Sequence, residues 1–424
     1  MKTVNNMVIA FLIIVLICLC GCTDETPDRV SDAEKKNTSL EKESEITSLL
    51  EKAGEEIGWG STDTNRTFSR FFGNMAVSPE AMYFIDKHNK QGNFKKLMYI
   101  DRKTGFCGPL CGKPECQHHS GECNSNTGSN TVVLGLSFYE NKLYWLSECF
   151  SSDAGYGWNI FRIDPDGFNR ELVRTSSTKN GKDTEIPGGN TEVFFHRGYL
   201  FVCGELSFGN ISQGEFQHET RVLAYSLVDE KQDYIIDECK SESAAYVRMQ
   251  PYQDDLYFFR AVVMPADNEI AVDRFTVGRF SITSGTTEIL CDRNQETRPG
   301  FIPIDLWVND TEILFTSESG QIYSLDKGSG AITLLPEFSQ KREAYGFPDI
   351  FEERILYFGT DHYLLYDREG NYMGKIAHPE FSACTLLGAD TYALYYYAEE
   401  EDRDVLGAVL HDGSGSIILW QSEG

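Results

Sequence analysis

Residues 142–173 read KLYWLSECFSSDAGYGWNIFRIDPDGFNRELV, and this stretch decides the fold. It contains an aliphatic–aromatic segment at 143–145, an alternating segment at 160–163 and an Asp-Pro-Asp-Gly cluster at 164–167. Aromatic and β-branched residues at a period of two indicate half-buried strands, and the Asp-Pro-Asp-Gly cluster favours a tight turn. The stretch therefore predicts two strands joined by a longer connection, followed by a turn into a further strand.

The aliphatic–aromatic segment recurs seven times along the chain, at residues 82–84, 143–145, 199–201, 256–258, 313–315, 355–357 and 393–395. Repeats of roughly 40 to 60 residues with two hairpins each are typical of four-stranded propeller blades. The sequence therefore predicts an all-β fold, a β-propeller of seven four-stranded blades, with six or eight blades as alternatives. Residues 205–220 and 262–277 are predicted as the largest inserted loops.

The N-terminal segment predicts that the protein is exported from the cytoplasm. Residues 7–19 are apolar, but they are too short for a comfortable transmembrane helix, and Leu19-Cys20-Gly21-Cys22 follows. This tetrapeptide resembles the bacterial lipobox, which implies that residues 1–21 are a signal peptide cleaved after Gly21. The resemblance also implies acyl chains, such as palmitate, on Cys22, and hence a protein held on the extracytoplasmic face of the cell membrane. The alternatives are a plain secretory signal and an N-terminal anchor helix.

Residues 22–65 are rich in Asp, Glu, Lys, Ser and Thr, which predicts a polar tether between the anchor and the propeller. Ile46, Leu49, Leu50, Ala53 and Ile57 fall near helical spacing, so the tether is predicted to contain a short amphipathic helix that packs on the propeller. The propeller domain itself is predicted over residues 66–424.

The charge of the chain restricts its partners. The sequence has 38 Lys and Arg residues against 65 Asp and Glu residues, a formal net charge of −27. So strong a negative charge argues against nucleic acid and against an anionic membrane surface as binding partners. It fits a soluble, exported domain whose contact with the membrane is the lipid anchor.

Four of the 12 cysteines crowd into a Cys/His-rich loop at residues 107–123. Cys111, Cys116, His118 and Cys123 together offer the Cys₃His ligand set of a closed structural zinc site, and Gly112, Pro114 and Gly121 supply turns. The alternative is a pair of disulfides among Cys107, Cys111, Cys116 and Cys123. In either case we expect the loop to be structural. Five further cysteines are scattered singly and are predicted to be small core residues, namely Cys149, Cys203, Cys239, Cys291 and Cys384.

No catalytic signature stands out. The chain contains no Gly-x-Ser-x-Gly elbow, no His-Glu-x-x-His pair and no phosphate-binding glycine loop. Carboxylates are so abundant that a glycosidase pair could always be chosen from them, so such a pair is no evidence. No catalytic residue and no cofactor beyond structural zinc is therefore predicted, and the chain is interpreted as more typical of a non-enzyme.

Two resemblances extend this interpretation. The lipobox, the acidic tether and the run from Leu110 to His118 with Cys123 resemble a group of surface lipoproteins of anaerobic Gram-positive bacteria. Residues 143–145 with 160–173 resemble one blade of the six-bladed propellers of low-density-lipoprotein receptors and of TolB-like bacterial proteins. The first resemblance implies a propeller on the outer face of the cytoplasmic membrane, and the second implies protein binding.

The sequence as a whole predicts a lipid-anchored, extracytoplasmic propeller that acts as a binding or interaction module for a protein or glycan ligand. The alternative is a carbohydrate-active hydrolase or lyase on the same scaffold. An enzyme should place two or more carboxylates, or a His/Tyr/Arg set, at the mouth of the central channel, whereas a binding module should show aromatic side chains or a flat acidic face there.

Overall fold

A computed structural model describes residues 46–50, 75–86, 95–128, 132–151, 155–177, 191–210, 215–229, 232–241, 245–266, 269–296, 301–338, 348–351, 354–359, 362–379, 381, 384–389, 392–400 and 403–422. The predicted signal peptide, Cys22 and most of the predicted tether lie outside these residues. Within the described ranges, no helix is both long enough and apolar enough to cross a membrane.

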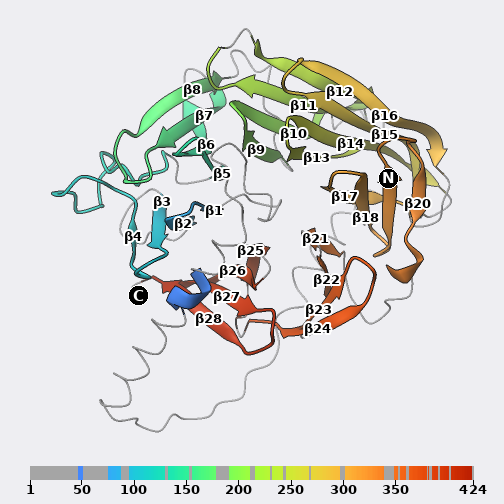
Figure 1. The fold of residues 1–424 in the computed structure, drawn as a ribbon. Coiled ribbons are helices and arrows are strands. Elements are labelled where there is room, and N and C mark those ends of the chain that lie inside the picture. The colour runs from blue at the N-terminus through green and yellow to red at the C-terminus, as the bar shows by residue number, and fades with distance from the viewer. Residues whose placement is uncertain are drawn as a thin grey trace.

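Seven four-stranded antiparallel sheets form a ring, each built from four strands consecutive in the chain (Figure 1). The strands of blades 1 to 4 are β1 (Met75–Val77), β2 (Ala81–Asp86), β3 (Lys96–Asp101), β4 (Cys107–Pro109); β5 (Val133–Tyr139), β6 (Lys142–Ser151), β7 (Gly155–Ile163), β8 (Glu171–Ser177); β9 (Glu192–His196), β10 (Tyr199–Asn210), β11 (Glu215–Ser226), β12 (Tyr234–Ser241); and β13 (Ala245–Tyr252), β14 (Asp255–Ala266), β15 (Glu269–Ser281), β16 (Thr286–Glu296).

The strands of blades 5 to 7 are β17 (Pro303–Val308), β18 (Glu312–Ser317), β19 (Ile322–Asp326), β20 (Ile332–Leu334); β21 (Asp349–Phe351), β22 (Arg354–Phe358), β23 (His362–Asp367), β24 (Tyr372–Ala377); and β25 (Cys384–Ala389), β26 (Ala393–Glu399), β27 (Asp404–Leu410), β28 (Ser416–Gln421). A 3₁₀ turn, η3 (Pro336–Phe338), follows blade 5, and residues 46–50 form one helical turn. The prediction of a seven-bladed β-propeller is confirmed. The chain therefore differs in blade number from the six-bladed propellers of low-density-lipoprotein receptors, which one of its blades resembles in sequence.

The repeated aliphatic–aromatic segments form the second strand of each blade, where they build the core. Phe84, Trp145, Phe201, Phe258 and Phe315 are all fully buried. Their clusters contain residues of two neighbouring blades, because alternate side chains of one strand face opposite sides of the sheet. The period-two pattern therefore specifies both the blades and the contacts between them.

The two predicted inserted loops are instead extensions of β-hairpins, so that prediction was wrong. The β10–β11 register continues out to Asn210 opposite Glu215, and the β14–β15 register continues out to Ala266 opposite Glu269. Ion pairs across the sheet help to hold the longer strands of blade 4, since Arg274 Nη2 lies 2.7 Å from Asp292 Oδ2. The longer repeats were interpreted as carrying inserted loops, but here the extra residues lengthen paired strands.

The scattered cysteines differ in their exposure. Cys203 and Cys291 are buried, as expected of small core residues, and Cys239 is half-buried. Cys384 is exposed, so the prediction was wrong for this residue. It occupies the first position of β25, where the chain enters the blade and packing is incomplete.

Side chains on the inner strands connect blade 3 to blade 4 and blade 4 to blade 5. Glu192 Oε2 on β9 accepts a hydrogen bond of 3.1 Å from the Met249 backbone N–H on β13. Gln250 Oε1 on β13 accepts one of 2.6 Å from the Val308 N–H on β17. These buried acceptors satisfy backbone donors at strand positions that face a neighbouring blade rather than a strand of their own sheet.

We expect Gln250→Ala to lower the free energy of unfolding by about 1–3 kcal/mol, because it removes the acceptor of a buried backbone N–H. Gln253→Ala is the matched control. Gln253 also contacts the next blade, through a 3.1 Å hydrogen bond to Asp310 Oδ1, but that contact is exposed and its loss should cost about 0.5 kcal/mol or less. Denaturant unfolding of both variants tests the difference. Equal losses of unfolding free energy in the two variants would show that the buried hydrogen bond contributes no more to stability than the exposed one.

Candidate metal centre

The Cys/His-rich loop is inserted into the fourth strand of blade 1. β4 pairs with β3 through Met98, Tyr99 and Ile100, and the Leu110 N–H continues the ladder to the Leu97 carbonyl at 2.9 Å. The next position along β3, Lys96, is instead paired with Asn126. The chain therefore leaves the sheet after Leu110, forms the loop, and returns to the same edge at residues 125–127.

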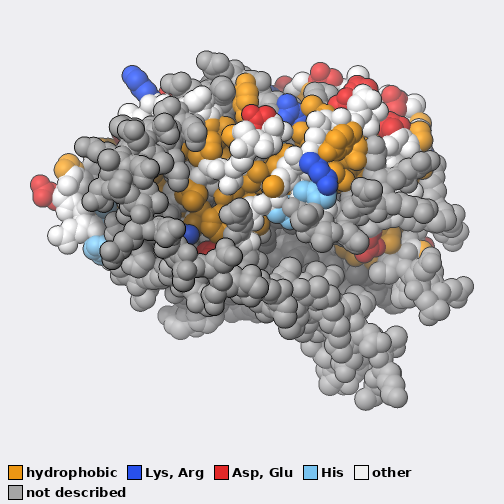
Figure 2. Space-filling model, turned by 90° about the horizontal axis from the view of Figure 1, so that it is seen from below, with side chains coloured by type: hydrophobic (Ala, Val, Ile, Leu, Met, Phe, Trp, Pro, Cys, Tyr) orange, Lys and Arg blue, Asp and Glu red, His pale blue; other side chains and the backbone are white. Residues whose placement is uncertain are grey.

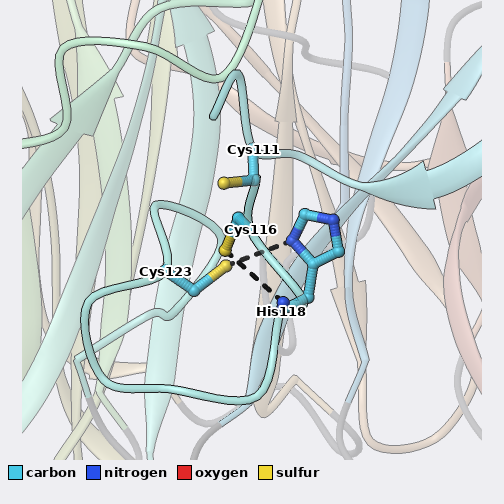
Figure 3. Close-up of side chains that lie close together, drawn as sticks. All are labelled: Cys111, Cys116, His118 and Cys123. Carbon is cyan, nitrogen blue, oxygen red and sulfur yellow. Dashed lines mark hydrogen bonds between the residues drawn. The ribbon is translucent and has the colours of Figure 1, made fainter. Parts of the chain in front are cut away.

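The loop brings together the four residues that the sequence singled out as metal ligands. The ligand atoms of Cys111, Cys116, His118 and Cys123 all lie within 4.8 Å of one another. Figure 3 shows the sulfurs of Cys116 and Cys123 beside the His118 imidazole, with the Cys111 thiol next to them. His118 Nδ1 lies 3.4 Å from Cys123 Sγ. Cys107 stays in β4 and is not a member of this cluster. All four cysteines of the loop region are free thiols in the structure.

Backbone geometry pre-forms the cluster. His118 adopts a left-handed conformation with φ of 60°, which lets its own N–H donate to Cys116 Sγ at 3.4 Å while its ring reaches Cys123. On the far side of the cluster, Ser125 Oγ lies 3.0 Å from Cys123 Sγ. N–H and O–H groups directed at sulfur stabilise thiolates and fix the orientation of metal ligands.

The electrostatics of the loop differ from one thiol to the next. Burial acts to raise the pKa of Cys111, but hydrogen bonds from the backbone N–H groups of Lys113 and Asn124 outweigh it, so this pKa lies below its usual value. Burial raises the pKa of Cys123 to about 11. Burial, together with the positive charge of Lys96, lowers the pKa of His118. Imidazole is therefore neutral near pH 7, the form that binds metals.

This donor set fits a bound metal ion. Around a zinc ion at about 2.3 Å from each sulfur, tetrahedral geometry places the sulfurs roughly 3.5–4 Å apart, close to the spacing that the loop already has. Four protein ligands fill a tetrahedral shell and leave no open position for substrate or water. The cluster can therefore bind a metal, and its chemistry is that of a structural site rather than a catalytic one.

The loop also contacts blade 2, through residues that the sequence did not reveal as partners. The Gly167 carbonyl in the β7–β8 turn accepts hydrogen bonds from the Gly112 N–H at 2.9 Å and from Asn124 Nδ2 at 2.8 Å. A Cβ on Gly167, whose φ is 79°, would lie 2.5 Å from the Gly112 nitrogen, so the turn requires glycine here. Trp145 Nε1 of blade 2 donates to the Thr127 carbonyl at 2.8 Å, just beyond the loop.

A second concave feature lies between the helical turn at 46–50 and blades 6 and 7. It is a pocket of about 660 Å³, lined by Ser48, Leu49, Arg354, Leu365, Met373, Tyr392, Leu410, His411, Asp412, Ser414, Gly415, Ser416 and Ile417. Arg354 Nη1 donates to His411 Nδ1 at 2.7 Å, which sets the orientation of both side chains. No sequence pattern indicated this pocket, because its walls come from three segments that are far apart in the chain.

Exposed apolar side chains lie near the pocket, on the outer strands of blades 6 and 7. Tyr372 and Met373 on β24 and Ile418 on β28 are between 39% and 56% exposed. β24 and β28 form the lower edge of the ring in Figure 1, and Figure 2 shows this edge, where hydrophobic side chains are spread between polar ones and acidic side chains gather toward one rim. The pocket thus opens near a surface of mixed polarity.

Comparison with known proteins gives distant likenesses only. No family model matches the chain, and no curated protein matches its sequence. Among solved structures, a prolyl endopeptidase is similar at 12% identity and a TM-score of 0.48 over 91% of this chain and 53% of its own. The β-propeller domain of the Trilobed protease from Pyrococcus furiosus is similar at 10% identity and a TM-score of 0.47 over 84% of this chain and 97% of its own. TolB from Acinetobacter baumannii is similar at 12% identity and a TM-score of 0.27 over 67% of this chain and 81% of its own. At this distance the likenesses do not bear on function.

Proposed function

We propose that this chain is a lipid-anchored, extracytoplasmic β-propeller that binds a small ligand, with a structural zinc ion in the loop of blade 1. The observation that carries the binding function is the pocket between the helical turn and blades 6 and 7. Its volume of about 660 Å³ is within the range of small-molecule sites, which combine apolar walls with a few polar groups.

The lining of the pocket favours a ligand with both hydroxyl groups and apolar faces, such as the end of a glycan. Ser414, Ser416 and the Asp412 carboxylate offer hydrogen-bonding partners for hydroxyl groups. Leu365, Met373 and the ring of Tyr392 offer surfaces on which the C–H face of a sugar can pack. A glycan ligand also agrees with a position outside the membrane, where cell-wall fragments are present.

The same lining favours binding over glycoside hydrolysis. Most glycosidases need two carboxyl groups flanking the scissile bond. Among the described residues that line the pocket, Asp412 is the one acidic residue. The carbohydrate-active hydrolase is therefore the weaker candidate at this site, even though an arginine, a histidine and a tyrosine are present.

The test is a binding screen of the purified protein against glycans and cell-wall fragments, with hits measured by calorimetry. We expect Ser414→Trp to reduce the affinity for a hit at least about tenfold, because the indole would occupy the pocket. Glu369→Trp, in the corresponding exposed turn of blade 6 but outside the lining, is the matched control and should bind normally. A hit whose affinity is unchanged by Ser414→Trp binds elsewhere and contradicts the assignment of the pocket, and release of cleaved products from a hit would favour the hydrolase.

A further inference from the structure

The ring closes where blade 7, the last in the chain, meets blade 1. Blade 7 consists of β25, β26, β27 and β28, and blade 1 consists of β1, β2, β3 and β4, each in chain order. Among the described strands, neither of these sheets contains a strand from the opposite end of the chain. Over the described residues, the contact at the seam between blades 7 and 1 is made by side-chain packing.

The helical turn at 46–50 supplies part of that packing. Leu50 is fully buried and Leu49 is 5% exposed. Both belong to one apolar cluster whose other buried members come from the two blades of the seam, namely Met75, Val77, Met82, Phe84, Met98 and Ile100 of blade 1 and Leu387, Ala393, Tyr395, Tyr397, Leu406, Ala408 and Leu419 of blade 7. Figure 1 shows the short helix lying beside β27 and β28 and next to blade 1.

A buried arginine fixes the turn to blade 1. Arg102, in the turn between β3 and β4, is only 5% exposed. Its Nε donates to the Leu50 carbonyl at 2.7 Å and its Nη1 donates to the Ser78 carbonyl at 3.1 Å. The guanidinium thus joins the last residue of the helical turn to the β1–β2 connection. Ile46 packs over the same β3–β4 turn, with its Cγ2 at 3.6 Å from a Cβ built on Gly105.

We propose that residues 46–50 are a clasp that holds blades 7 and 1 together. The clasp precedes the propeller in the chain and lies in the segment predicted as tether, so the tether is attached to the ring at its seam. A cut between residues 50 and 75, or a pull on the tether, would then act directly on ring closure. The proposal rests on the packing of the described residues and is independent of the lipid anchor and of the ligand pocket.

Hydrogen exchange measured by mass spectrometry on the purified protein tests the clasp. In Leu50→Asp, we expect exchange in β1–β4 and β25–β28 to rise at least about tenfold, while the strands of blades 3 to 5 keep their protection, because only the seam loses its packing. Leu50→Ala is a milder variant in case the aspartate prevents folding, and should shift the same segments in the same direction. Ser48→Asp, at an exposed position of the same turn, is the matched control and should leave exchange at the seam unchanged.

Two outcomes would overturn the proposal. If exchange rises only in residues 46–50 and around Arg102, the helical turn does not contribute to the closure of the ring. If exchange rises equally in all seven blades, Leu50 contributes to global stability and not to the seam. Arg102→Met should reproduce the pattern of Leu50→Ala, because it removes the hydrogen bonds to the Leu50 carbonyl while keeping an apolar side chain in place.

Discussion

Protein purified without added metal is expected to contain close to one zinc ion per chain. The three thiols and one imidazole of the blade 1 loop already lie within 4.8 Å of one another. Three thiolates and one imidazole in a closed tetrahedral shell are a typical structural zinc site, and such sites hold the ion with free energies of about 10–16 kcal/mol in small zinc domains. Elemental analysis of the purified protein, with the protein concentration measured independently, checks the ratio.

His118→Ala should weaken the retention of zinc by more than about 100-fold, since loss of a direct ligand should cost more than the 10–100-fold that follows loss of an outer partner. Cys107→Ser is the matched control. Cys107 is only a few residues away and is also a thiol, but it lies in β4 and its sulfur is not part of the cluster. Burial and the charge of Asp86 raise its pKa to about 12, which further disfavours the thiolate that a metal needs. Competition with a chromogenic chelator measures both variants.

The disulfide alternative predicts a different result from the same samples. Purified protein would carry no metal, alkylation under denaturing conditions would find no free thiols among Cys107, Cys111, Cys116 and Cys123, and Cys107→Ser would disturb the loop as much as Cys123→Ser. That set of results would exclude the zinc site. A loss of retention in His118→Ala but not in Cys107→Ser supports it.

Removal of the metal should loosen the contact between blades 1 and 2 more than the rest of the ring. The loop leaves the fourth strand of blade 1 after Leu110, and its two hydrogen bonds to the Gly167 carbonyl reach blade 2. A polar, glycine-rich loop of this kind has little apolar area with which to offset the entropy of ordering it. A metal bound here would therefore supply order that the sequence of the loop would not supply alone.

The blades could be predicted from sequence because they depend on local information. Each second strand carries its own aromatic residue, such as Trp145 or Phe258, and each hairpin carries its own turn residues, so the period is visible without any knowledge of distant contacts. The four candidate metal ligands were visible for the same reason, since one short loop contains all of them. The extended hairpins of blades 3 and 4 were missed because the longer repeats were interpreted as carrying inserted loops, whereas the added residues continue the strand pairing.

The ties between blades and the pocket could not be predicted, because their partners are distant in the chain and ordinary in type. Gln250 meets Val308, and Arg354 meets His411, only after the ring has brought neighbouring blades together. A buried glutamine has no local pattern that separates it from an exposed one such as Gln253. The proposed clasp was partly visible, since the spacing of Ile46, Leu49, Leu50, Ala53 and Ile57 predicted a helix that packs on the propeller, but its place beside blades 7 and 1 depends on the closure of the whole ring.

Cys22→Ser is expected to abolish stable attachment to the membrane. Lipid is transferred to sulfur, so a serine hydroxyl at this position cannot accept it. Each buried CH₂ of an acyl chain contributes about 0.8 kcal/mol, and a single chain gives only reversible binding, whereas two or three chains hold a protein stably. The variant should therefore appear in the medium, or remain at the membrane only as an unprocessed precursor that keeps its signal segment, and the retained fraction of processed protein should fall from almost complete to almost none.

Cys20→Ser provides the matched control for this experiment. It removes a thiol two residues away, but the predicted cleavage after Gly21 discards this position, so the mature protein should be unchanged. Fractionation of cells into membrane and soluble parts, with the mass of the N-terminal peptide of each form, distinguishes the outcomes. A Cys22→Ser protein that is cleaved and still fully retained in the membrane would refute the lipid anchor, because the attachment would then have to come from another part of the chain.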